Sequence, residues 1–191
     1  MIREEQGMNA AYDAVMARRT AHRYRTDPLP EGAIERALAA ANHAPCHRLT
    51  FPWRFIRVGP RSRRVLADLA VAIKAAKQPV DPDAAGRIAR KVLDPPELVV
   101  ACQRRSPDPF QAREDYAACA CAIQNFCISM AGEGVHTKWS TGALTRDPRA
   151  WEFLGVDPAV AEVIGFLWAG HADAPGPIER PPLEAVVRTM P

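Results

Sequence analysis

Apolar residues recur every three or four positions along six stretches of the chain, the spacing that places them on one face of an α-helix. In residues 61–77, for example, Leu66, Leu69 and Ile73 share a face. The predicted helices cover residues 9–19, 31–42, 61–77, 81–93, 110–132 and 147–154.

Four other stretches are typical of β-strands. Residues 53–58 alternate apolar side chains with Arg54 and Arg57, as in a strand that buries one face. Residues 97–102 and 158–170 are mostly apolar, as in buried strands, and residues 135–142 predict a strand followed by a loop. Because these strands are scattered between helices without a strict β-α-β alternation, the pattern predicts an α+β fold with a small sheet flanked by helices.

A single domain accounts for the predicted elements, because 191 residues are enough for one core and few for two. From His171 onward the chain is rich in proline, which favours an extended conformation. We therefore expect residues 1–191 to form one domain with an extended C-terminal segment over residues 171–191.

The predicted helix over residues 110–132 is unusual, because residues 116–131 are almost all small or apolar. Gln124, Asn125 and Ser129 are the only strongly polar interruptions. A helix that is apolar on nearly every side has to be buried on nearly every side, and a core of this size rarely surrounds one helix completely. Burial against a second copy would satisfy the pattern, which therefore favours a homodimer.

The composition of the chain bears on four features, namely nucleic-acid binding, disulfides, metal binding and membrane association. A net charge of +3, spread along the chain, does not favour nucleic acid. Five cysteines without a framework spacing suit reduced core residues. His43, Cys46 and His47 are of metal-ligating types, but no second cluster completes a tetrahedral site, so no metal is expected. Without a secretory leader or a long apolar run, we expect a cytoplasmic protein with no membrane partner.

Side chains that can bind a ligand are most concentrated at residues 18–23, Arg-Arg-Thr-Ala-His-Arg, where the first predicted helix ends. A guanidinium offers a fixed fork of donors that fits a phosphate, and the hydroxyl of Thr20 adds a short neutral donor. The segment is therefore suited to a phosphorylated cofactor. Cations at the end of a helix also complement the negative end of its dipole, and the residue types alone leave both interpretations open.

Four motifs, spread in order over residues 12–187, resemble those of the FMN-dependent nitroreductase family, most closely its compact members. The motifs are Arg18-Arg19-Thr20; Ala44-Pro45-Cys46-His47 with Pro52-Trp53-Arg54-Phe55; Ala122-Ile123-Gln124-Asn125 with Gly134, Trp139 and Gly142-Ala143-Leu144; and Val163-Ile164-Gly165-Phe166 with Gly170 and Arg180-Pro181-Pro182-Leu183. The resemblance implies a mostly antiparallel central sheet and a two-fold dimer with FMN sites at the subunit interface.

The resemblance also implies roles for the cations at both ends of the chain. Arg18 and Thr20 would hold the FMN phosphate, with Arg19 close by, and Arg180 would supply a second cation from the C-terminal segment. The other interpretation of Arg180 is a solvated charge in a loose tail.

Around the flavin ring, His22 stands where the family often has arginine or lysine, and a protonated histidine would favour negative charge on the reduced ring. His47 lies in the loop that, in the family, reaches the flavin of the partner subunit, although it is otherwise an ordinary surface histidine. The stretch Trp139, Ser140, Thr141 and Gly142 is similar to the one beside the reactive face of the ring. Trp139 is equally suited to packing in the core.

The implied activity is an FMN-dependent NAD(P)H oxidoreductase, with NADH or NADPH as donor and a nitroaromatic, quinone or activated alkene as acceptor. Hydride transfer would follow a ping-pong order, and no catalytic acid, base or nucleophile is needed, because the cofactor carries the chemistry. Two alternatives stay open: a flavin-binding protein with little turnover, and a related flavoenzyme that oxidises or cleaves its substrate.

Overall fold

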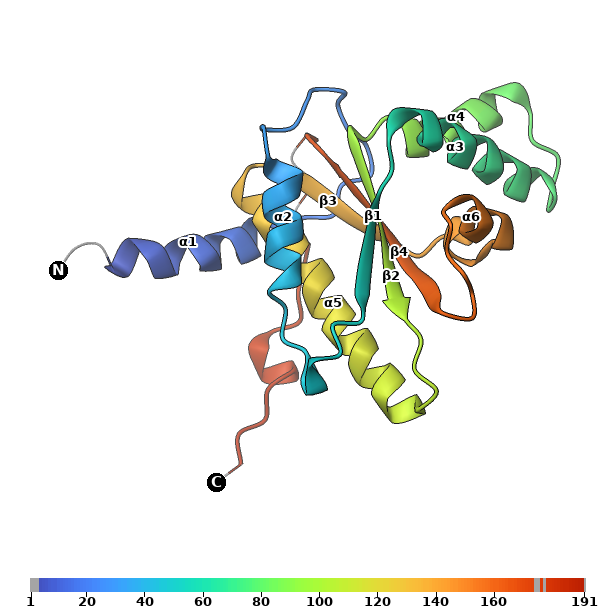
Figure 1. The fold of residues 1–191 in the computed structure, drawn as a ribbon. Helices are drawn as coiled ribbons and strands as arrows, with labels where there is room; N and C mark the ends of the chain where they lie inside the picture. The colour runs from blue at the N-terminus through green and yellow to red at the C-terminus, as the bar shows by residue number, and fades with distance from the viewer. Residues whose placement is uncertain (1–3, 174–175, 177, 191) are drawn as a thin grey trace.

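The computed structural model describes residues 4–173, 176 and 178–190, and its centre is a four-stranded sheet between two layers of helices (Figure 1). The strands lie in the order β1-β2-β4-β3, and each neighbouring pair is antiparallel. They are β1 (Trp53–Arg57), β2 (Glu97–Arg104), β3 (His136–Ser140) and β4 (Ala161–Gly170). The predicted α+β fold with a small antiparallel sheet flanked by helices is therefore confirmed.

The helices begin and end close to where the apolar spacing places them. They are α1 (Glu4–Ala17), α2 (Ala33–Asn42), α3 (Pro60–Ala75), α4 (Pro82–Leu93), α5 (Pro109–Gly132) and α6 (Pro148–Phe153), with short 3-10 turns η1 (His47–Leu49), η2 (Ala143–Arg146) and η3 (Leu183–Ala185). Three of them start at an Asp-Pro pair, in which the aspartate accepts a hydrogen bond from a backbone N–H of the first turn. The proline that follows has no N–H to leave unpaired, so the pair fixes a helix start.

Strand β2 shows how the sheet separates two cores. Val99 and Ala101 pack on the face covered by α2 and α5, whereas Leu98, Val100 and Cys102 face α3 and α6. Successive side chains of a strand point to opposite faces, and both faces of this sheet are covered, as Figure 1 shows. A strand buried on both sides needs a continuous apolar run, which explains the sequence of β2.

The two ends of the chain leave this body. Helix α1 extends away from the sheet, and the C-terminal segment runs past α5 and ends at a distance from it (Figure 1). Helix α1 begins five residues earlier than the predicted 9–19 and ends at Ala17, so Arg18 and Arg19 follow the helix. The described part of residues 171–191 lacks strands and α-helices and contains the turn η3.

Of the five cysteines, Cys102, Cys119 and Cys127 are buried and all five are free thiols. Burial raises the pKa of Cys102 to about 11 and that of Cys119 to about 12, which keeps both thiols protonated and inert at neutral pH. Within the described part of the chain, no helix combines the length and apolar character that a membrane span needs.

Candidate functional site

A cavity of about 450 Å³ opens between the sheet, helices α3 and α4, and the segment that follows α1. We call it the central pocket. Its apolar walls come from Ile73, Ile88, Leu144, Phe166 and Trp168. Its polar lining consists of His22, Arg23, Tyr24, Lys91, Lys138, Ser140, Gly142 and Thr145. Its size and its apolar walls with a few polar groups are those of a small-molecule or cofactor site.

Cations crowd one edge of the central pocket. The Nζ atom of Lys138 lies 3.3 Å from Nδ1 of His22. Burial lowers the pKa of Lys138, and the positive charge of Lys91 lowers it further. The positive charges of Lys91 and Lys138 repel each other, so this edge of the pocket favours an anionic ligand.

The alternation of strand β3 decides which of its residues reach the central pocket. Lys138 and Ser140 point into it, whereas Trp139 points to the opposite face of the sheet. The indole Nε1 of Trp139 donates to the carbonyl of Ile164 at 3.1 Å, and a Cβ on Gly165 would overlap the indole ring. Trp139 therefore packs in the core of its own chain.

The segment after α1 reaches the central pocket by running along the edge of β3. Thr20 forms a parallel bridge with Thr137, and the N–H of Ala21 donates to the carbonyl of Thr137 at 3.3 Å. This pairing places His22 beside Lys138. Further along, the N–H of Arg25 donates to the carbonyl of His171 at 2.8 Å, which joins the segment to the end of β4.

A smaller cavity of about 350 Å³, the end cavity, lies along the same segment. It is lined by Thr20, Ala21, His22, Arg23, Tyr24, Arg25, Ala172 and Asp173. The end cavity and the central pocket share His22, Arg23 and Tyr24. The two cavities are thus neighbours along one stretch of chain.

The two arginines after α1 differ in their surroundings. The guanidinium of Arg19 donates to the carbonyls of Met16 and Arg18, where it complements the negative end of α1. Arg18 lies near Cys127 of α5. Burial raises the pKa of the Cys127 thiol, and the positive charge of Arg18 opposes that rise. Of the two interpretations left open by the sequence, the helix-end role fits Arg19. Among the described residues the guanidinium of Arg18 makes no hydrogen bond or ion pair.

Three other predicted site residues lie away from Arg18. Arg180 is exposed in the C-terminal segment, and among the described residues no hydrogen bond or ion pair joins it to residues 18–20. Thr141 is exposed and does not line the central pocket, although Gly142 beside it does. His47 lines a separate, open cavity near Glu114 and Cys121, so a single chain does not bring His47 to His22.

The loop that carries His47 is held in a strained conformation. Arg48, Leu49 and Phe51 have φ values of 58°, 52° and 42°, in the left-handed region that favours glycine. Each such residue costs about 1–3 kcal/mol, so the surrounding contacts have to impose the conformation. Leu49 and Phe51 are nevertheless 70% and 46% exposed.

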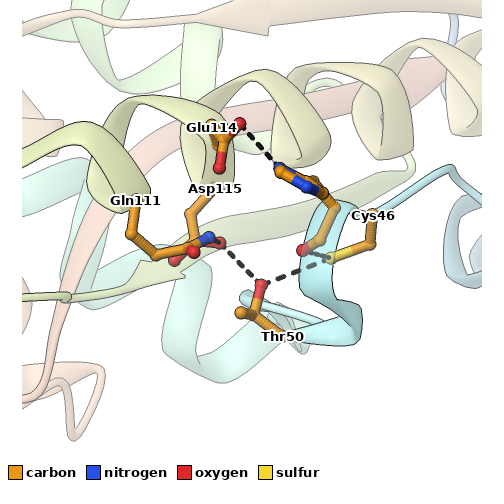
Figure 2. Close-up of polar contacts among 6 residues, drawn as sticks. Cys46, Thr50, Gln111, Glu114 and Asp115 are labelled. Carbon is orange, nitrogen blue, oxygen red and sulfur yellow. Dashed lines mark hydrogen bonds and ion pairs between the residues drawn. The ribbon is translucent and has the colours of Figure 1, made fainter. Parts of the chain in front are cut away.

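Figure 2 shows the contacts that hold this loop against α5. The hydroxyl of Thr50 donates to Oδ1 of the buried Asp115 at 2.6 Å, and the side-chain amide of Gln111 donates to the same oxygen at 2.8 Å. Nδ1 of His47 lies 2.7 Å from Oε1 of Glu114. A buried carboxylate with two donors fixes its partners firmly, so Asp115 anchors the loop.

Lys91 and Lys138 line the central pocket without having been predicted from the sequence. The prediction of a strand over residues 135–142 contains the signal for Lys138, since the alternation of side chains along a strand places Lys138 and Ser140 on one face. Lys91 lies on α4, which approaches the pocket only because it packs on α3. The sequence around Lys91 therefore contains no indication that its side chain lines the pocket.

An apolar pocket with a cationic edge, set beside a helix-covered antiparallel sheet, is suited to a small anionic, largely apolar molecule. The chain matches the model of the Nitroreductase family over residues 15–171 and belongs to that family. Membership of this family makes the chain an oxidoreductase by class.

Relatives and solved structures agree with this membership. The chain is 26% identical over 166 residues to the candidate NAD(P)H nitroreductase YdjA of Escherichia coli (strain K12), covering 84% of this chain and 87% of YdjA. It is 31% identical over 129 residues to the 5,6-dimethylbenzimidazole synthase of Rhodospirillum rubrum, covering 64% and 58% of the two chains. It superposes with a TM-score of 0.77, at 18% identity, on a variant of the FMN- and NADPH-dependent nitroreductase NfnB from sphigopyxis sp. strain HMH, covering 94% and 98%, a likeness of fold.

Proposed function

We propose that the protein is an FMN-dependent NAD(P)H oxidoreductase that reduces small acceptors of the nitroaromatic, quinone or activated-alkene type. The observation that carries the proposal is the central pocket, in which Arg23, Lys91 and Lys138 face a space walled by apolar residues. FMN is the cofactor named for a solved structure of this fold, and NAD(P)H the donor named for a relative.

The chemistry of the central pocket fits a flavin. The ring system is flat and largely apolar, which suits walls such as Ile88 and Phe166. Its pyrimidine edge becomes anionic on reduction, which suits the cluster of His22, Lys91 and Lys138. When bound, FMN supplies the two-electron chemistry that moves a hydride from a nicotinamide to an acceptor. The chain's own cations would stabilise negative charge at that edge without moving during the reaction.

The phosphate of FMN would lie toward the end cavity. Thr20 lines this cavity, and Arg18 follows α1 two residues earlier. Asp173 also lines the end cavity, but it lies 3.4 Å from the guanidinium of Arg25, which offsets its charge. Arg180 would add a second cation if it came from another copy of the chain.

We propose that the working form is a homodimer, because the single chain exposes too much surface for its mass. Its accessible area is 12455 Å², whereas a compact monomer of this mass exposes about 9,000 Å². A permanent dimer, whose interface buries about 2,000–5,000 Å² or more over both chains, would cover part of this excess. The excess includes exposed apolar side chains on α1 and in the C-terminal segment, namely Tyr12, Val15, Met16, Leu183, Val186 and Val187.

The exposed side of α5 supports the same proposal. Ala117, Cys121 and Gln124 follow one another at helical spacing and are all exposed, and Tyr116 beside them is 45% exposed. The opposite side of α5 is buried against α2 and the sheet. An open stripe on the longest helix that is small or apolar at Tyr116, Ala117 and Cys121 and polar at Gln124 is suited to a second copy.

A dimer would also explain the strained conformation of residues 47–51. His47, Leu49 and Phe51 lie too far along the chain's own α5 to share the central pocket. Presented to a second copy, His47 would meet the partner's flavin, and the two apolar side chains would exclude water beside it. The cost of holding three left-handed residues is offset when the loop presents these groups in a fixed conformation.

An absorbance titration tests the cofactor. The purified protein should bind FMN with a shifted flavin spectrum, and anaerobic NADH or NADPH should bleach that spectrum much faster than in a free-flavin control. Sedimentation of the FMN-loaded protein should give the mass of a dimer. A monomeric protein that leaves the FMN spectrum unchanged at micromolar concentrations would refute the proposal.

A second candidate function is favoured by the 31% identity to a 5,6-dimethylbenzimidazole synthase. In that case the protein would break down its flavin or another substrate and would not simply reduce an acceptor. Incubating the FMN-loaded protein with NADPH under air and analysing the products separates the two. Intact FMN and a reduced acceptor support the oxidoreductase, whereas loss of FMN with a new aromatic product supports the second function.

A further inference from the structure

A second basic cavity lies beside the central pocket. It has a volume of about 510 Å³, and we call it the basic groove. Its lining consists of His22, Arg23, Tyr24, Arg87, Arg90, Lys91, Asp94 and Pro95. Four of these residues, His22, Arg23, Tyr24 and Lys91, also line the central pocket, so the two cavities share a wall.

The charge of the basic groove is not balanced by the chain. Arg23, Arg87, Arg90 and Lys91 face it together with a single carboxylate, that of Asp94. Among the described residues these four cations take part in no ion pair. Some exposed arginines elsewhere are paired, as Arg36 is with Glu133 and Arg149 with Asp147, and others, such as Arg64, are not paired within the described chain. What distinguishes the basic groove is that four such unpaired cations face one cavity.

Helix α4 gives the groove its geometry. Arg87, Arg90 and Lys91 stand at positions i, i+3 and i+4, so they share one face and repel one another. The dipole of α4 accounts for cations in its last turn, where Arg90 and Lys91 lie. It does not account for Arg87, which lies in the preceding turn, or for Arg23, which comes from another segment.

We propose that the basic groove binds the 2′-phosphate of NADPH and makes NADPH the preferred electron donor over NADH. This proposal rests on the proposed function, because it takes the nicotinamide to enter the central pocket. A phosphate monoester carries nearly two negative charges and accepts bidentate donation from arginine forks. Dinucleotide-binding proteins commonly use an arginine for this phosphate, and the shared wall lets one donor molecule occupy both cavities.

The first experiment compares the two donors. The FMN-loaded protein, the double variant Arg87→Gln/Arg90→Gln and the control Arg64→Gln are assayed with NADPH and with NADH. Arg64 is exposed on α3 and lines none of these cavities. We expect the unaltered protein and the control to favour NADPH by roughly tenfold or more in kcat/KM. The double variant should lose that preference through a higher KM for NADPH, while the values for NADH change less than about twofold.

The second experiment needs no turnover. Calorimetric titration should show that 2′,5′-ADP binds the FMN-loaded protein at least roughly tenfold more tightly than 5′-AMP, and that the double variant removes the difference. Arg23→Gln should weaken the binding of 2′,5′-ADP in the same way. Because Arg23 lies outside α4, this variant shows that the loss in the double variant is not caused by misfolding of α4. Equal binding of the two nucleotides by the unaltered protein overturns the proposal.

Three further outcomes separate this proposal from the proposed function. If the protein binds FMN and uses NADH and NADPH equally well, the groove has been misassigned and the oxidoreductase stands. If the double variant no longer binds FMN but still binds 2′,5′-ADP as tightly as the unaltered protein does, the groove holds the flavin phosphate and the proposal is overturned. If 2′,5′-ADP binds as expected but FMN does not, the proposed function fails and the phosphate site stands.

Discussion

Replacing Asp115 by alanine should release the loop that carries His47 and destabilise the whole chain. Asp115 is 3% exposed, and its Oδ1 atom accepts hydrogen bonds from Thr50 at 2.6 Å and from Gln111 at 2.8 Å. Each hydrogen bond to a charged group is worth about 1.5–3 kcal/mol. Deleting the carboxylate leaves two buried donors without this acceptor, and water entering the gap recovers part of the loss. We expect the free energy of unfolding to fall by about 2–4 kcal/mol.

Urea denaturation followed by tryptophan fluorescence measures this change. Asp115→Asn keeps the size of the side chain and one acceptor oxygen, so it should lose roughly half as much as alanine. Asp68→Ala, on the exposed side of α3, is the matched control and should shift stability by less than about 0.5 kcal/mol. Limited proteolysis should cut Asp115→Ala within residues 46–51 faster than the unaltered protein. A loss below about 0.5 kcal/mol in Asp115→Ala would refute the anchoring role.

Three further predictions follow from single contacts. Arg18→Ala should weaken FMN several-fold or more in a spectral titration, whereas Arg19→Ala, whose guanidinium binds the end of α1, should change it less than about twofold. Gly165→Val should destabilise the chain by at least about 2 kcal/mol in urea denaturation, because any Cβ there overlaps the indole of Trp139. Burial, helped by nearby cations, lowers the pKa of His136 below its usual 6.5. The unfolded state then binds more protons below about pH 6.5, so stability should fall as the pH drops from 7 to 5, and His136→Gln should flatten that dependence.

The fold was predictable because its determinants are local. The Asp-Pro pairs that begin three helices depend on two adjacent residues, and the continuous apolar run of β2 depends only on burial of both faces. The first helix is where prediction fell short: residues 4–8 lack the apolar spacing of residues 9–17, although the structure continues the helix through them. Amphipathic spacing predicts a helix that packs against the protein along its whole length. Because α1 extends away from the sheet, its first residues do not need that spacing.

The candidate site was less predictable, because cavities form between segments that are distant in the sequence. His22 and Ser140 line the central pocket, and their roles beside a flavin stay predictions. Lys91 joins them only because α4 packs on α3. Trp139 belongs to the core because the pleat of β3 turns it away from its neighbours. Arg180 and His47 stay predictions, since the residues they would meet belong to a second copy.

Several features of the free chain cost stability, and each has a ligand or partner that would offset the cost. Lys91 and Lys138 repel each other at the edge of an apolar pocket, which an anionic ring would relieve. Leu49 and Phe51 are exposed on strained backbone, which a second copy would cover. A molecule that binds only the folded state stabilises it by mass action. FMN and a higher protein concentration should therefore each raise the melting temperature, and their effects should reinforce each other, because the same loop would bind the flavin and the partner.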